Sequence, residues 1–219
     1  MSSSSESADG TGPLTEFREV VRNRRMTRAF TADPIDPAVI DDLVDLASRA
    51  PSAGKTQGWH ALVLEGADQV SRYWDIALPA EQRSTFRWTH LLDAPVLMLV
   101  FADPTAYVER YSEPDKARTG LGAGVEAWPT PYWTVDASMS AMTVLLAAED
   151  RGLGALFFGV FQREDAVRAE LDVPDHLQVI GMIALGHPRV DGDEPGRSAP
   201  RRRRSADQII HRGRWQSPA

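Results

Sequence analysis

The sequence predicts a layered α/β or α+β fold in which helices cover both faces of one sheet. Amphipathic helical stretches alternate with short apolar runs bounded by turn residues, a pattern typical of a sheet packed against helices. The 219 residues, of which 42% are hydrophobic, suffice for one full core. We expect a single domain over residues 14–219, preceded by a disordered Ser- and Gly-rich tail over residues 1–13.

The composition narrows the classes of function. The chain has no cysteine, which excludes disulfides, thiol catalysis, iron–sulfur clusters and Cys-ligated zinc. The five histidines lack a ligand spacing such as HExxH, so we expect no metal site. The net charge of -7 argues against a nucleic-acid partner. Because no apolar run is long enough for a membrane helix and no secretion signal is visible, we expect a cytoplasmic protein without a membrane partner.

Two helices are predicted near the N-terminus. A short amphipathic helix should cover residues 14–24. The second should cover residues 36–50, because Asp36 can cap it, Pro37 suits its first position and Pro51 stops it.

Two buried strands follow, over residues 60–66 and 95–103, because both runs are short, apolar and end in polar residues. Between them, residues 67–90 should form two helical stretches. Residues 107–132 hold several Gly and Pro residues and no steady period, which indicates a long excursion over a site.

The second half centres on one helix over residues 134–150, which is apolar almost all round. We then expect a strand and turn over residues 155–161, a surface helix over 162–171 and a central strand over 177–188.

Three motif-like stretches carry little weight. GLGAGV at Gly120 lacks the preceding strand and following helix that a dinucleotide-binding loop needs. AGKTQ lacks the first glycine of a Walker phosphate loop, and the serines of ASMSA lack a Gly-x-Ser-x-Gly elbow. What remains is the binding of anions and heterocycles.

Two arginine clusters are suited to an anion. They are RNRRMTRAF near the N-terminus and APRRRRSAD near the C-terminus. Guanidinium groups bind phosphate oxygens bidentately and keep their charge at any working pH, so the clusters would form a phosphate site if they converge in space. The alternative for the run from Arg201 to Arg204 is a solvated tail.

The order of five motifs resembles the FMN-dependent nitroreductase family over residues 16–215. The motifs are RRMTRAF, APSAGKTQGW, DASMSAMTVLLAAEDRGLGALFFGVF, VIGMIALGHP and the C-terminal basic cluster. The resemblance implies an α+β, three-layer α/β/α sandwich with a mixed, mainly antiparallel central sheet. It also implies non-covalent FMN, NAD(P)H as co-substrate and a homodimer with two active sites at the subunit interface.

Carried over by motif, Arg24 and Arg28, with the backbone near Met26, would hold the FMN phosphate and ribityl chain. Arg25 is an alternative for one of them. The family usually has serine where Met26 stands, so a side-chain hydrogen bond to the cofactor is lost.

In the C-terminal cluster, Arg201 and Arg203 match the second half of the phosphate clamp. The other two arginines of the run would be solvated.

The turn that begins at Pro51 and Ser52 would run along the flavin, where Ser52 and the backbone of Ala53 allow a close approach. Lys55, if it reaches the pyrimidine edge, would stabilise negative charge on the reduced flavin and raise its reduction potential. The alternative is a solvated lysine. Gln57 would hydrogen-bond to the ribityl chain or the pyrimidine edge.

On the other side of the ring, a backbone N–H near Gly159 or Val160 would face flavin N5 and tune hydride acceptance. Phe158 would stack near the ring or, equally, belong to the core. No side chain is expected as a nucleophile, so Lys55 and Gly159 are electronic tuners and the flavin carries the chemistry.

The aromatic residues of the excursion, Tyr107, Tyr111, Trp128 and Tyr132, could form a lid over a planar acceptor or could pack the dimer. The helix over residues 134–150 would form the dimer interface.

The resemblance implies a ping-pong oxidoreductase that passes electrons from NAD(P)H through FMN to a small-molecule electrophile such as a nitroaromatic or a quinone. Three alternatives stay open. They are an FMN storage protein of the same fold, an enzyme that cleaves the flavin with oxygen, and an interaction protein that docks through Arg201–Arg204.

Overall fold

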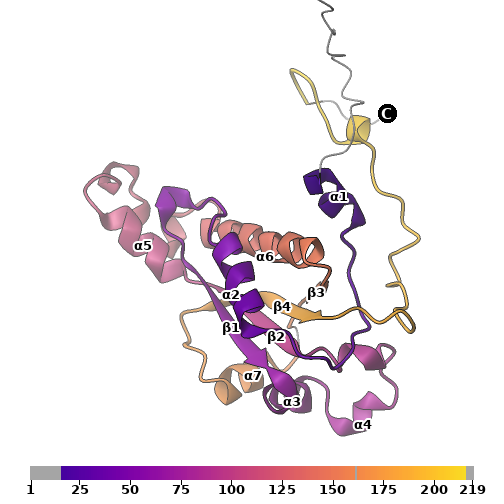
Figure 1. The fold of residues 1–219 in the computed structure, drawn as a ribbon. Coiled ribbons are helices and arrows are strands. Elements are labelled where there is room, and N and C mark those ends of the chain that lie inside the picture. The colour runs from indigo at the N-terminus through magenta and orange to yellow at the C-terminus, as the bar shows by residue number, and fades with distance from the viewer. Residues whose placement is uncertain (1–15, 161, 216–219) are drawn as a thin grey trace, which may run out of the picture.

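The computed structural model describes residues 16–160 and 162–215, which form three layers (Figure 1). The predicted tail over residues 1–13 and the start of the first predicted helix lie outside the described residues. Within the described residues, no helix is long and apolar enough to cross a membrane.

The middle layer is a sheet of four strands in the order β1-β2-β4-β3. These are β1 (Trp59–Glu65), β2 (Val96–Ala102), β3 (Gly154–Phe158) and β4 (Gln178–Gly186). All three strand pairings are antiparallel, and within residues 16–160 and 162–215 parallel pairing is limited to one isolated bridge between Met26 and Ala155. The α+β sandwich is therefore confirmed, with a sheet that is antiparallel throughout its named strands. The central position of β4 is confirmed as well.

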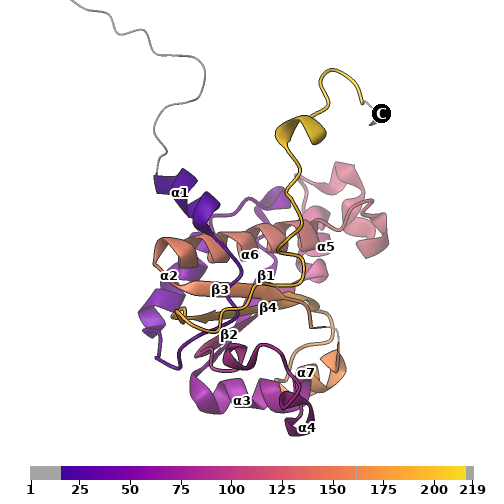
Figure 2. The ribbon, with the colours of Figure 1, turned by 90° about the vertical axis from the view of Figure 1, so that its right-hand side faces the viewer.

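One face of the sheet is covered by α2 (Pro37–Ala47) and α6 (Tyr132–Asp150), as Figure 2 shows. Their buried side chains pack on Val96, Met98 and Val100, which alternate along β2 and so point to one face. Asp36 caps α2 by accepting a hydrogen bond from the Ala38 N–H, as predicted, but the helix ends three residues before Ala50.

The opposite face is covered by α3 (Gly66–Ala77) and α7 (Glu164–Glu170), with the short α4 (Ala80–Arg83) beyond α3 (Figure 1). Here the other residues of β2, Leu97, Leu99 and Phe101, pack against the helices. All seven residues of β2 are therefore buried, which explains its unbroken apolar run.

The expectation of an irregular excursion over residues 107–132 was wrong in its first part. Residues Pro104–Ser112 form the helix α5, and only three short 3-10 turns follow it. Asp103 caps α5 through hydrogen bonds from the Thr105 and Ala106 N–H groups, and Pro104 occupies the first helical position.

Two segments lie outside the three layers. The first is α1 (Glu16–Asn23), and the second is the C-terminal arm, defined here as residues 189–215, which includes a short 3-10 turn (Ala206–Gln208). Both views show α1 and the last part of the arm beyond α6, whereas the arm begins at the level of the sheet (Figures 1 and 2).

Candidate functional site

The N-terminal arginine cluster is fixed to the edge of the sheet. Met26 forms the parallel bridge to Ala155, and the Thr27 N–H donates a hydrogen bond to the Ala155 carbonyl at 3.0 Å. The approach is close because a Cβ on Gly154 would lie only 2.8 Å from Thr27 Cγ2. The arginines on either side of Met26 are thus held by the fold.

Arg24 presents a donor that no described residue satisfies. Its Nη1 atom is buried and has no hydrogen-bond partner in the structure. By contrast, Arg25 is 66% exposed and lies 3.6 Å from Asp193, and Arg28 Nη1 donates to the Met26 carbonyl at 3.0 Å. Because an arginine stays charged and a buried unsatisfied donor is costly, Arg24 is the member of the cluster best suited to an incoming anion.

The C-terminal arm starts on the same cluster. The Arg28 N–H donates to Asp193 Oδ1 at 2.7 Å, and a Cβ on Gly196 would lie 2.9 Å from Arg28 Nη2. Arg201 and Arg203 themselves are exposed, and no described contact joins their side chains to Arg28. The root of the arm therefore meets the N-terminal cluster, while the roles of Arg201 and Arg203 stay predictions.

A cavity of about 600 Å³ opens beside the end of β3. Phe158 is half-buried there, with its ring stacked on Trp74 at 6.0 Å between centroids and 8° between planes. Among the described residues, the N–H groups of Gly159 and Val160 donate to no backbone carbonyl. The lining includes Arg28, Trp74, Trp88, Phe158, Gly159 and Val160. One cavity thus joins part of the arginine cluster to the predicted N5 segment.

Met26 links these two parts through its side chain. Its Sδ accepts a hydrogen bond from the Phe157 N–H at 3.5 Å. The Met26 thioether therefore accepts a backbone hydrogen bond near the end of β3.

The predicted flavin turn over residues 51–57 is a tight, internally bonded loop. Ser52 Oγ accepts from the Gln57 N–H at 3.0 Å, and Gln57 Nε2 donates to the Ser48 carbonyl at 2.9 Å. Pro51, Ser52, Lys55 and Gln57 line a separate cavity of about 540 Å³. The side chains of Ser52 and Gln57 are thus engaged within the loop and its flank, whereas Lys55 is exposed.

Two residues that sequence reasoning missed hold this turn in place. Asp136 Oδ2 accepts from the Ala53 N–H at 2.7 Å, and Arg110 Nε donates to the Gly54 carbonyl at 3.0 Å. The available signal for Asp136 was a single acid inside the apolar stretch of the central helix.

The aromatic residues of the predicted lid pack largely on one another. Tyr107 is 1% exposed and Trp128 8%, whereas Tyr111 is half-buried and Tyr132 is 44% exposed. The Tyr107 hydroxyl donates to Asp136 Oδ2 at 2.7 Å. Burial, and then this hydrogen bond, raise the pKa of Tyr107 far above its ordinary value. A role for these residues toward a substrate stays a prediction.

The predicted cofactor residues fall into two groups at opposite ends of α6. Ala53 is bonded to Asp136 near the start of the helix, whereas Met26 is bridged to Ala155 just after its end. From Asp136 to Asp150 the helix rises roughly 20 Å. The cavities beside the two groups share no lining residue.

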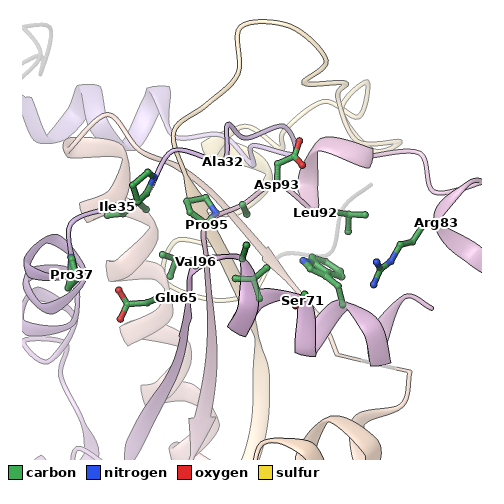
Figure 3. A pocket seen from close by; sticks show the side chains of 16 residues that line it. Ala32, Ile35, Pro37, Glu65, Ser71, Arg83, Leu92, Asp93, Pro95 and Val96 are labelled. Atoms are coloured by element: carbon green, nitrogen blue, oxygen red, sulfur yellow. The ribbon is translucent and has the colours of Figure 1, made fainter. Parts of the chain in front are cut away.

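A third cavity, of about 590 Å³, lies near the N-terminal end of α3 and contains none of the predicted cofactor residues. Figure 3 shows Arg83 and Pro37 at its opposite ends, with Pro95 and Val96 between them. Two of its charged side chains are already paired, because Arg83 bonds to Asp75 and Asp93 to His90.

Comparison with known proteins agrees with this fold. A family model described as "Nitroreductase family" matches residues 21–187. Three curated relatives extend over most of the chain. A 4-nitrobenzoate reductase of Nocardioides sp. is 28% identical in an alignment of length 200 that covers 80% of this chain and 81% of the relative. A 5,6-dimethylbenzimidazole synthase of Rhodospirillum rubrum is 30% identical in an alignment of length 204 that covers 84% of this chain and 90% of the relative. An NADH dehydrogenase of Thermus thermophilus is 26% identical in an alignment of length 198 that covers 84% of this chain and 92% of the relative.

Among solved structures, a protein from Exiguobacterium sibiricum in complex with FMN has the same fold. The TM-score is 0.67 at 19% identity, and the match covers 94% of this chain and 100% of the other.

Proposed function

This chain belongs to the nitroreductase family of oxidoreductases, and from that premise we propose that it binds FMN non-covalently and uses it to oxidise NAD(P)H. The observation that carries the proposal is the buried Nη1 of Arg24, which no described residue satisfies. A phosphate at that point would give the guanidinium the bidentate partner that it lacks.

The residues near the sheet edge would contact different parts of FMN, from the phosphate to the ring. Arg24 and Arg28 would hold the phosphate, with Arg201 and Arg203 closing over it from the arm. The N–H groups of Gly159 and Val160, which donate to no backbone carbonyl among the described residues, would face the ring at N5. We propose that Arg25, paired with Asp193, contributes only long-range charge.

When bound, FMN would take a hydride from NAD(P)H and pass electrons in a second half-reaction to an electrophile such as a nitroaromatic or a quinone. The chain's own groups would orient the ring, supply positive charge at its pyrimidine edge through Lys55, and exclude water by the aromatic wall of the cavity at the end of β3. No side chain is required as a nucleophile.

We propose further that the active site forms between two copies of this chain. The arginine group and the turn over residues 51–57 lie about 20 Å apart along α6 within one chain, so a second copy could complete each site. An exposed apolar stripe on α6 suits such a contact, since Val135 is 39% and Met142 41% exposed at positions seven residues apart on one helix face. Phe17 and Val21 add exposed apolar area on α1.

The test is an absorbance spectrum of the purified protein, followed by anaerobic addition of NADPH and then NADH. The proposal expects flavin bands that bleach with at least one donor and return when a quinone or nitroaromatic is added. A protein that stays colourless after FMN is supplied contradicts it. Flavin bands that persist with both donors indicate a storage protein of the same fold.

A second candidate is an enzyme that consumes the flavin with oxygen, and the 30% identical relative named 5,6-dimethylbenzimidazole synthase favours it. Its named product contains the dimethylated benzene ring that flavins also contain. Reduced protein opened to air separates the two: a reductase returns to the original flavin spectrum, whereas a flavin-consuming enzyme loses it stoichiometrically and releases a new aromatic product.

A further inference from the structure

Asp136 is a buried acid whose hydrogen bonds converge on one oxygen atom. Its side chain is 4% exposed, and Oδ2 accepts from both the Ala53 N–H and the Tyr107 hydroxyl, each at 2.7 Å. No ion pair among the described residues includes it. A buried carboxyl group without a cation beside it depends on its hydrogen-bond donors, which here are the Ala53 N–H and the Tyr107 hydroxyl.

The turn that Asp136 holds has an unusual backbone. Gly54, Lys55 and Gln57 all have positive φ, of 64°, 56° and 53°. Residues other than glycine rarely adopt this region, and they keep it only where surrounding contacts determine the conformation. The bonds of Ser52 and Gln57 lie within the turn and its flank, so among the described residues the hydrogen bonds that reach it from distant elements are those of Asp136 and Arg110.

We propose that Asp136 is a positioning residue for the flavin. It fixes the Ala53 N–H, and thereby the strained backbone that presents Ser52 and Lys55 to the cofactor. Through Tyr107 it also ties this turn to the aromatic cluster of Tyr107, Trp128 and Trp133. This inference rests on the proposed FMN-dependent function.

Variants of Asp136 and Tyr107 separate the bond to the Ala53 N–H from the bond to the Tyr107 hydroxyl. Asp136→Ala removes the acceptor of both the part-buried Ala53 N–H and the buried Tyr107 hydroxyl. Asp136→Asn keeps the shape and one carbonyl oxygen but loses the charge. Tyr107→Phe removes only the link to the aromatic cluster. Ser140→Ala is the matched control, because Ser140 lies one turn along on α6, is similarly buried at 3% exposure and makes no hydrogen bond to the turn among the described residues.

The experiment measures two quantities for the wild type and each variant. The first is amide hydrogen exchange of residues 51–57 in the FMN-free protein, which reports the turn directly. The second is the Kd for FMN from quenching of flavin fluorescence. We expect Asp136→Ala to speed exchange of the turn and to weaken FMN binding at least about tenfold relative to Ser140→Ala. Asp136→Asn should recover part of both losses, and Tyr107→Phe should weaken binding about threefold.

The outcomes separate this inference from the function on which it rests. Unchanged exchange of the turn in Asp136→Ala overturns the tether. Faster exchange with unchanged FMN binding, in a protein whose wild type binds FMN, overturns the positioning role alone. If the wild type binds no FMN, the proposed function and the positioning role fall together. If Asp136→Ala does not fold, the same criteria apply to Asp136→Asn and Tyr107→Phe.

Discussion

Replacing Arg24 with methionine should have opposite effects on cofactor affinity and on the stability of the FMN-free protein. Methionine keeps the unbranched apolar stem and removes the guanidinium, whose Nη1 is buried without a partner. A hydrogen bond to a charged group contributes about 1.5 to 3 kcal/mol, so losing the phosphate contact should weaken FMN binding roughly tenfold to a hundredfold. Removing an unsatisfied buried donor should meanwhile leave the free energy of unfolding unchanged or raise it by about 1 kcal/mol.

Riboflavin supplies the control ligand for this prediction, because it lacks the phosphate. Titrations with FMN and with riboflavin, followed by flavin fluorescence, should show that Arg24→Met weakens FMN binding and leaves riboflavin binding unchanged. Arg22→Met is the control variant, since Arg22 is exposed in the last turn of α1. An equal loss for both ligands, or a marked loss of stability in the FMN-free variant, would refute the assignment of Arg24 to the phosphate.

Three further predictions follow from the packing and the charges. Gly154→Ala should lower the free energy of unfolding by about 1 to 3 kcal/mol, measured with urea, because its Cβ would meet Thr27 Cγ2 at 2.8 Å; an unchanged midpoint would show that the N-terminal segment can move away. Burial raises the pKa of both Tyr73 and Tyr107, so their neutral forms favour the folded state: this stability is complete below the unfolded pKa of about 10 and is lost as pH rises above it. At about pH 11 the absorbance change from tyrosine ionisation should therefore be smaller in the folded protein than in the unfolded chain, by the contribution of these two residues. An equal change in the folded protein would contradict their burial. Met142→Glu, on the exposed stripe of α6, should convert a dimer to a monomer in light scattering, whereas the exposed Glu81→Lys on α4 should not; a Met142→Glu protein that stays dimeric would place the interface elsewhere.

The elements with a clear hydrophobic period could be predicted from the sequence, and α5 shows why others could not. Asp103 and Pro104 give the same cap signal as Asp36 and Pro37, and both pairs start helices in the structure. Nearby Gly and Pro residues concealed α5, and its one buried residue, Tyr107, packs in an aromatic cluster with Trp128 and Trp133, so its sequence has no steady hydrophobic period.

The candidate site was predictable where motifs name residues and unpredictable where distant chain segments meet. Arg24 and the segment around Gly159 come from local motifs. Asp136 acts on Ala53, which is 83 positions away, and Asp193 on Arg28, which is 165 away. Such pairs depend on how the helices and the arm are placed, which no local pattern contains.

The bridge between Met26 and Ala155 also protects the sheet. β3 is an edge strand, and an open strand edge is a template on which other chains can assemble. The segment that carries Arg24 and Arg28 covers part of this edge, since it takes up the Ala155 carbonyl. A truncation that removes this segment should therefore do more than weaken cofactor binding, because it would leave the edge of β3 open to aggregation. The yield of soluble protein would then fall together with its flavin absorbance.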